Sequence, residues 1–390
     1  MSKVAGPLAG LRVVALEQAV AAPLCSRHLA DLGADVIKVE RPDGGDFSRG
    51  YDSFVKGMAS HFVWLNYRKR SVALDLKSHE GRETLLRLLK TADVFISNLS
   101  PGAVERIVSA HELEQLNPRL VTCQISGYGP SGPYHERKAF DLLVQGEAGV
   151  TANTGLPGKP AKPGVSLADL GAGIYAATAI LAALRSRDLT GRGEQLHISM
   201  FDVLAEWMSP LLLAYREGGD IIEPAGTRHA TITPYGPFCA ADGSVINIAV
   251  QNDRQWLRLC AVLALDELAC DSRLATNSGR LQYREKVEGA VADAVSTWSS
   301  AELAEAFDRE GVPWGRLNQT ADVARHPQLE EGRRWRAVDL PSGSSASVLA
   351  HPFRFARGES DRGTPRVPAL GEHTDEVLRE LSNEAEADQG

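Results

Sequence analysis

The sequence has few cysteines and no long hydrophobic run. Its five cysteines are spread over 390 residues without a C-x-x-C pair, which argues against a disulfide framework and a thiolate zinc site. The ten histidines form neither an H-x-x-x-H nor an H-E-x-x-H pair, so we expect no metal centre. The longest apolar stretch, residues 174–184, is too short to span a bilayer, and the N-terminus lacks the apolar core of a signal peptide. We therefore expect a cytoplasmic protein without a membrane partner.

Basic residues are also fewer than acidic residues. The 42 Lys and Arg residues against 50 Asp and Glu residues give a formal net charge of −8. This balance offers no general attraction for nucleic acid, so an anionic ligand needs a local basic cluster. Hydrophobic residues make up 43% of the chain, as in ordinary globular proteins, and the length predicts two domains.

The first third of the chain alternates between short buried strands and helices. Such alternation predicts an α/β fold with a mostly parallel, doubly wound sheet. Ligands of these sheets bind at the carboxyl ends of the strands, which directs attention to Gln18, Arg41, Asn98 and Gly127. The expected strands are 11–16, 34–40, 71–76, 93–97 and 120–126, and the expected helices are 23–32, 80–90 and 104–116.

Two polar, Gly- or Ser-rich stretches, residues 217–226 and 341–345, look like crossings between domains. Between them, residues 238–250 predict a hairpin, and helical patterns follow at 255–263, 282–297 and 301–310. The chain is therefore divided into a large domain beginning with residues 1–215, a smaller α+β domain at 226–335, and a segment at 346–390.

Residues 171–176 (GAGIYA) match the G-x-G-x-x-A dinucleotide fingerprint, but their context is wrong. The fingerprint needs a strand before it and a second strand ending at the acidic residue. Here helix leads to Asp188, so close packing of a buried helix over 172–183 explains the small residues better. Asp169 stands at the start of this helix, where unpaired amides and the dipole favour a carboxylate. It is either an ordinary helix cap or, beside the Gly/Pro-rich loop 155–163, part of a site.

Basic residues occur beside or after the strands. As single residues they are ordinary solvated charges, but as a set at one sheet edge they indicate a phosphorylated ligand. The set comprises Arg41, Lys69, Arg70, Lys77, Arg106 and Lys138.

Several short motifs are weak alone but specific in their order. They are LGADVIKVERP at 32–42, NYRKRS at 66–71, ISGYG at 125–129, TGRGE at 190–194 and LGEHT at 370–374. Through them the chain resembles, over nearly its whole length, the family III CoA-transferases (CaiB/BaiF, formyl-CoA transferase-like).

The resemblance implies a Rossmann-like large domain built from both ends of the chain, an inserted small domain, and two chains interlocked as a homodimer. It implies that Asp169 is the nucleophile, that CoA enters as a thioester substrate, and that no cofactor is tightly bound. By position, Gln18 and Val20 match residues near the thioester. The residues matching the CoA pocket are Arg41, Leu74, Lys77, Asn98, Leu99, Arg106 and Lys138.

The implied reaction moves CoA from an acyl-CoA to a carboxylic acid through mixed anhydrides and an aspartyl-CoA thioester. Backbone amides near Asp169 are expected to stabilise the oxyanion. The run of glycines typical of formyl-CoA transferases is missing from residues 226–236. Arg228 and His229 stand there instead, either as solvated linker charges or as partners of a distal carboxylate. The resemblance thus favours C4–C5 dicarboxylates such as succinate or mesaconate, including mesaconyl-CoA C1–C4 transfer.

Two alternatives stay open. The 2-methylacyl-CoA racemases share this fold, but they need a His base where this chain has Phe140, and a small-domain carboxylate for which Asp253 is an uncertain match. A CoA-binding protein without catalysis is the other, although a pure binder would not need Asp169.

Overall fold

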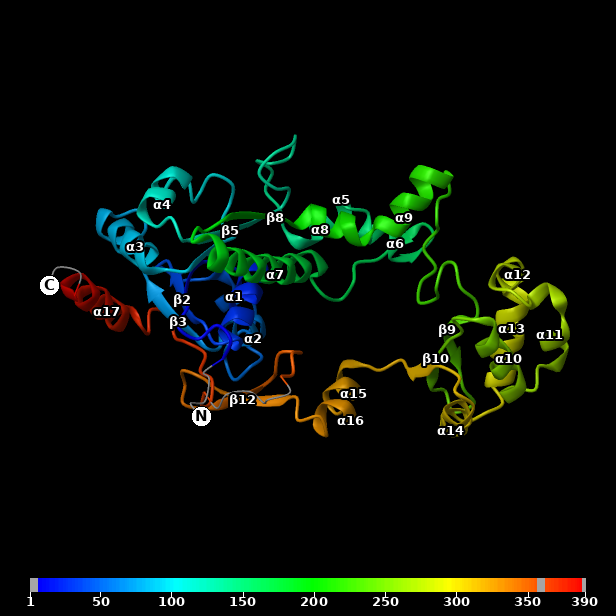
Figure 1. Ribbon diagram of the computed structural model, residues 1–390. Helices are drawn as coiled ribbons and strands as arrows, with labels where there is room; N and C mark the ends of the chain where they lie inside the picture. The colour runs from blue at the N-terminus through cyan, green and yellow to red at the C-terminus, as the bar shows by residue number, and fades with distance from the viewer. Residues whose placement is uncertain (1–5, 356–361, 388–390) are drawn as a thin grey trace. The chain divides into compact units, whose positions relative to one another are not determined.

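The computed structural model describes residues 6–355 and 362–387 (Figure 1). The contacts divide the chain into two units. The large unit comprises Met1–Val150, Pro163–Ser209 and Glu331–Gly390, and the small unit comprises Thr151–Lys162 and Pro210–Glu330. The large unit is therefore built from both ends of the chain, as the resemblance implies.

A six-stranded parallel sheet forms the centre of the large unit, in the order β3-β2-β1-β4-β5-β8. This confirms the expected α/β class. Four strands, β1, β2, β4 and β5, coincide closely with predicted ones because runs of β-branched residues are buried on both faces, whereas β3 begins two residues earlier than expected and β8 was not predicted. Their bounds are β1 Arg12–Leu16, β2 Asp35–Glu40, β3 Lys69–Ala73, β4 Val94–Ser97, β5 Val121–Ser126 and β8 Gln195–Ser199.

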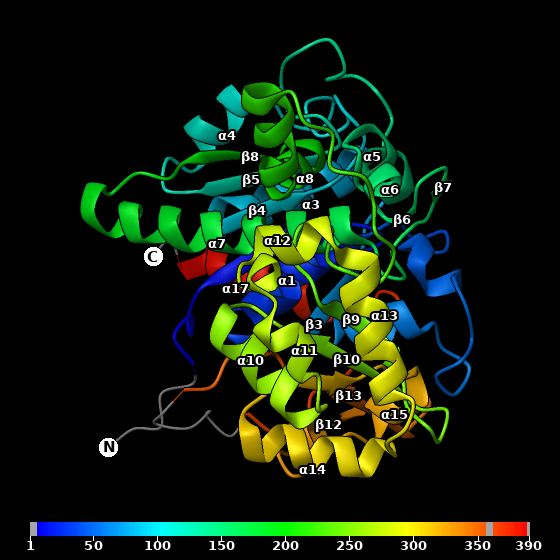
Figure 2. The same ribbon diagram turned by 90° about the vertical axis from the view of Figure 1, so that its right-hand side faces the viewer.

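Helices cover both faces of this sheet. On one face α1 (Ala21–Asp31), α7 (Leu167–Thr190) and α8 (Met200–Trp207) bury the alanines and small aliphatic residues of a first core. Figure 2 shows α7 running beside β4, β5 and β8. On the other face α3 (His79–Thr91), α4 (Ala110–Leu116) and the C-terminal α17 (Thr374–Ala387) complete a leucine-rich core.

Helix α7 is longer than the apolar pattern indicates. Within the described part of the chain it is the one helix long and apolar enough to cross a membrane, with a mean hydropathy of 1.7 over its best 18-residue window. Its small residues instead face the sheet and α1, since a Cβ on Gly173 would lie 2.6 Å from the Ala21 carbonyl oxygen. The glycines of the rejected dinucleotide fingerprint thus permit close helix packing, as predicted.

Two differences from the expected elements have local causes. The helix expected over 104–116 begins only at Ala110, because Ser109 and Glu112 form a capping box that starts it there. Residues 341–345 are no crossing between domains: they form the turn joining β12 (Trp335–Asp339) to β13 (Ser345–Leu349) in an antiparallel hairpin of the large unit. Gly343, at φ +82°, suits this turn.

The small unit has an antiparallel sheet in the order β11-β10-β9, packed on a helical layer. The hairpin predicted at 238–250 is present as β9 (Tyr235–Cys239) and β10 (Val245–Ala249), with β11 at Trp314–Arg316. Residues 151–162, which the predicted boundaries assign to the large domain, belong to this unit. Its main helices are α10 Asp253–Val262, α11 Asp266–Cys270, α12 Asn277–Gln282, α13 Arg284–Val295 and α14 Ser300–Glu310.

Candidate active site

Two cavities in the large unit share the lining residues Gln18 and Leu99, which follow the carboxyl ends of β1 and β4. Cavity A has a volume of about 530 Å³ and contains Asp169. Cavity B has a volume of about 490 Å³ and contains Arg41. Both lie where a parallel α/β sheet is expected to bind ligands.

Nearly all the residues that the family resemblance assigns to the nucleophile, the thioester or the CoA pocket line one of these cavities; Arg106 lines neither. Arg106 is exposed, and its guanidinium lies over Gly102, where a Cβ would come within 3.3 Å of Nη1. Cavity A takes Gln18, Val20, Asn98, Leu99, Lys138 and Asp169, and cavity B takes Gln18, Arg41, Leu74, Lys77 and Leu99.

Asp169 is the third residue of α7 and is half-buried. Beside it the buried Asp141 acts as the side-chain cap, since its Oδ1 accepts the backbone N–H of Ala168 at 3.0 Å. The N–H of Leu170 bonds to the Ser166 carbonyl at 2.9 Å. The expectation that nearby backbone amides stabilise an oxyanion therefore fails for these two amides, because they are already bonded. Side-chain donors lining cavity A include Gln18, Tyr51 and Lys138.

Aromatic residues that the sequence analysis missed form part of cavity A. Phe47, Tyr51 and His61 line it, and the Tyr51 ring lies 5.7 Å from each of the other two rings, edge-on to His61. Burial, together with the negative charges of Asp46 and Asp169, raises the pKa of Tyr51 to about 12. Its hydroxyl therefore keeps its proton at neutral pH. No motif marks these rings, which come from separate short segments after β2: Phe47 begins a 3₁₀ helix (Phe47–Gly50), Tyr51 follows it, and His61 lies in α2 (Ser60–Asn66).

Asn98 holds the backbone of the loop between β1 and α1. Its Oδ1 accepts the N–H of Gln18 at 2.9 Å, and its Nδ2 donates to the Gln18 carbonyl at 2.8 Å. Ala19, the next residue, has φ +61°, a left-handed conformation that costs a non-glycine residue about 1–2 kcal/mol. The loop that both cavities share is thus held in a conformation that it would not adopt alone.

A buried chain of charges lies beneath this loop. Glu17 Oε1 accepts from Lys69 Nζ at 2.7 Å and from Lys38 Nζ at 3.2 Å, and Lys38 also donates to Asp46 Oδ2 at 2.8 Å. All four side chains are almost completely buried. Burial opposes ionisation of Glu17, but the two ammonium groups outweigh it and lower its pKa. For Lys69 burial prevails, and its pKa falls to about 8.

Two members of the predicted basic set therefore have other roles. Lys69 binds Glu17 in the buried chain of charges and therefore does not bind a ligand. Arg70 bonds to Asp35 and to Glu380 of α17, so it ties the C-terminal helix to the sheet. The exposed Arg41 and Lys77 remain beside the apolar walls of cavity B, with Arg41 Nε 3.8 Å from Asp43.

At the positions where a racemase needs its base and its small-domain carboxylate, this chain has Phe140 and Asp253. Phe140, 65% exposed, precedes α5 (Asp141–Glu147) and lines cavity A, where it cannot transfer a proton. Asp253 lies in the small unit and accepts from the buried Arg280 at 3.0 Å. Among the described residues, the histidine that lines cavity A is His61.

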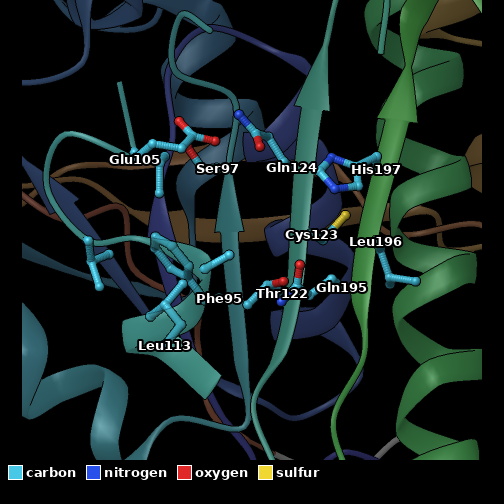
Figure 3. Close-up of a pocket in the computed structure, with 13 residues that line it drawn as sticks. Phe95, Ser97, Glu105, Leu113, Thr122, Cys123, Gln124, Gln195, Leu196 and His197 are labelled. Atoms are coloured by element: carbon cyan, nitrogen blue, oxygen red, sulfur yellow. The ribbon is translucent and has the colours of Figure 1, made fainter. Parts of the chain in front are cut away.

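A third, smaller cavity lies on the face of β4, β5 and β8 beside α4 (Figure 3). Ser97, Gln124 and His197 point into it from the strands, with Glu105 opposite. Its volume of about 80 Å³ admits two or three waters but no large ligand. In the described part of the chain, no three His, Cys, Asp or Glu residues are grouped so as to hold a metal ion.

Comparison with known proteins identifies the family. The model of CoA-transferase family III matches residues 8–374. The chain is 35% identical to the succinate–glutarate CoA-transferase of Agrobacterium fabrum, over 96% of each protein. It is 34% identical to the succinyl-CoA:mesaconate CoA-transferase of Haloarcula hispanica, again over 96% of each. A solved CaiB/BaiF family protein from Brucella suis is 35% identical over 96% of this chain and 99% of its own, with a TM-score of 0.82. The chain therefore belongs to the family III CoA-transferases and is an enzyme of that class.

Proposed function

We propose that this enzyme transfers CoA between small dicarboxylic acids, with Asp169 as the nucleophile. The observation that carries the proposal is the pair of cavities that meet at Gln18 and Leu99, one holding Asp169 and the other holding exposed cations. An acyl-CoA whose nucleotide end occupies cavity B would reach cavity A with its thioester. Relatives named for succinate, glutarate and mesaconate support C4–C5 dicarboxylates as the acids.

In the proposed mechanism, a carboxylate oxygen of Asp169 attacks the thioester carbonyl, and the carbon–sulfur bond breaks to release CoA thiolate. The thiolate then attacks the Asp169 carbonyl of the mixed anhydride, which forms an aspartyl-CoA thioester and frees the donor acid. The acceptor carboxylate repeats these two steps in reverse order and regenerates Asp169. The covalent route keeps the energy of the thioester from being lost to water.

Cavity B is suited to a CoA nucleotide. Arg41 and Lys77 supply positive charge for phosphate groups, and Leu74 and Leu99 supply apolar surface. Arg106 and Lys138 are proposed as further CoA contacts, and Val20 as a neighbour of the thioester. Arg228 and His229, which the sequence leaves as linker charges or as partners of a distal carboxylate, have partners of their own in the structure. Within the small unit, Arg228 Nη1 lies 3.2 Å from Glu288 Oε2, and the His229 ring stacks on Tyr235 at 5.1 Å.

Replacing Lys77 with methionine is expected to raise the KM for acyl-CoA about fivefold to tenfold, because a charge-assisted contact to phosphate is lost. The kcat should change less than twofold, since Lys77 is remote from the bond that breaks. Arg87→Met, on the exposed surface of α3 and outside both cavities, is the matched control. Steady-state kinetics at two salt concentrations measures both constants. An unchanged KM would exclude Lys77 from CoA binding.

We also propose that the enzyme is a cytoplasmic homodimer that holds no cofactor tightly, as the family resemblance implies. Exposed apolar side chains on α7, namely Ile174, Tyr175, Leu181 and Leu189, support contact with a second chain. An interlocked arrangement would cover them.

Trapping the covalent intermediate tests the proposed function. The protein is incubated with succinyl-CoA or mesaconyl-CoA, with and without glutarate, quenched with borohydride or hydroxylamine, and analysed by peptide mass spectrometry. We expect a modification at Asp169 that glutarate discharges while glutaryl-CoA appears. The absence of an adduct with every donor, together with solvent deuterium entering C2 of a 2-methylacyl-CoA, would replace this proposal with racemisation.

A further inference from the structure

We infer that Asp46 is a positioning residue for the reaction: it holds Ala19 in its left-handed conformation and thereby directs Gln18 and Val20 toward the space beside Asp169. The inference rests on the proposed function of Asp169. Asp46 lies in the loop after β2 and is 98% buried, since its exposed fraction is 2%. It lines cavity B, and it acts on the neighbourhood of Asp169 through the backbone of Ala19.

The two carboxylate oxygens of Asp46 have separate partners. Oδ1 accepts the N–H of Ala19 at 3.1 Å and the N–H of Ser48 at 2.9 Å, whereas Oδ2 accepts from Lys38 at 2.8 Å. Lys38 in turn donates to the side chain and, at 3.4 Å, to the carbonyl of Glu17. The Asp46 carboxylate therefore binds the backbone of Ala19 directly. Through Lys38 it is also connected to the backbone of Glu17, two residues earlier in the chain.

Other polar backbone groups of the loop have a different side-chain partner. Asn98 binds both the N–H and the carbonyl of Gln18. Only Asp46 restrains the residue with positive φ itself, among the side-chain bonds to the described loop residues 18–20. Loss of the Asp46 carboxylate therefore frees Ala19 to return to an ordinary conformation, which swings Gln18 and Val20 relative to Asp169.

The fold supplies a matched control at the far end of the sheet. Asp93, before β4, also accepts a backbone N–H with one oxygen, that of Arg12 at 2.8 Å, and pairs with a buried cation through the other, Arg187 at 3.0 Å. Asp93 lines neither cavity A nor cavity B. Asp93→Ala thus removes a backbone bond and an ion pair of the same kinds without touching the loop.

The experiment measures the first-order rate at which saturating succinyl-CoA modifies Asp169. We expect Asp46→Ala to slow this rate about 100-fold, as displacement of reacting groups by about 1 Å does, and Asp93→Ala to slow it less than twofold. Adding Ala19→Gly to Asp46→Ala should recover about tenfold, because glycine adopts a positive φ without restraint. A merely structural Asp46 would not produce this recovery.

The measured rates distinguish a failure of this inference from a failure of the proposed function. Equal rates for Asp46→Ala and Asp93→Ala, compared at equal folded fraction by circular dichroism, would overturn the positioning role, as would failure of Ala19→Gly to restore the rate. If Asp46→Ala does not fold, Asp46→Asn is compared with Asp93→Asn; the amide oxygen of Asn can still accept from Ala19, so similar rates are expected, and a rate about 100-fold lower for Asp46→Asn would overturn the positioning role. A wild-type protein that forms no adduct would refute the proposed function itself, and this inference with it.

Discussion

Replacing Asp169 with alanine is expected to lower CoA transfer more than about 1000-fold while the protein stays folded. In the proposed mechanism the covalent intermediate forms on the Asp169 carboxylate. Without that carboxylate the intermediate cannot form, and the neighbouring residues then have no reaction to assist. Asp169 is only half-buried, and Asp141 rather than Asp169 caps Ala168, so the helix N-terminus survives the change. The rate of glutaryl-CoA formation from succinyl-CoA and glutarate measures the effect.

Asp188→Ala is the control for this experiment, because Asp188 is an exposed aspartate at the other end of the same helix. It should retain full activity. Binding of CoA to the Asp169→Ala variant, followed by calorimetry, separates chemistry from binding: we expect the affinity to change little. If the Asp169→Ala protein still transferred CoA, another residue would be the nucleophile. If it kept its biological role without transferring CoA, the alternative of a CoA-binding protein would be favoured.

Replacing Glu17 with alanine is expected to destabilise the large unit by about 3–5 kcal/mol, the cost of leaving buried charges without their partner. Glu17 joins the ammonium groups of Lys38 and Lys69, and none of the three side chains is exposed. Ser26 Oγ, which donates to Glu17 Oε2 at 2.5 Å, also loses its acceptor. Of the carboxylates in direct contact with the two lysines among the described residues, Asp46 would be the one that remains.

Hydrogen exchange of the backbone amides in β1 and β2 measures this loss as a lower free energy of opening. Glu114→Ala is the matched control, because it breaks an ion pair with Arg192 in which both side chains are more than half exposed. That change should cost less than about 1 kcal/mol. Equal protection in the Glu17 and Glu114 variants would mean that solvent reaches the Glu17 cluster and that its charges contribute little.

Much of the fold was predictable because burial on a parallel sheet leaves a direct trace in sequence. Strands such as 94–97 are nearly continuous apolar runs, and the helices between them repeat leucine or alanine at helical spacing. The edge strand β8 escaped prediction, since its Gln195 and His197 are exposed and interrupt the run. The helix around Asp169 was predictable in kind, but its full length was not.

The sequence by itself determined the alternation of strands and helices, the family, and the candidacy of Asp169, because each depends on neighbouring residues or on ordered motifs. Only the tertiary structure decided which charges meet. Lys69 and Glu17 are 52 positions apart and form one buried pair, so Lys69 could not be distinguished from a ligand-binding lysine by spacing. In the same way, Asp46 reaches Ala19 across 27 positions. Periodicity reports which face a residue occupies, whereas partners on that face are set by how distant segments pack.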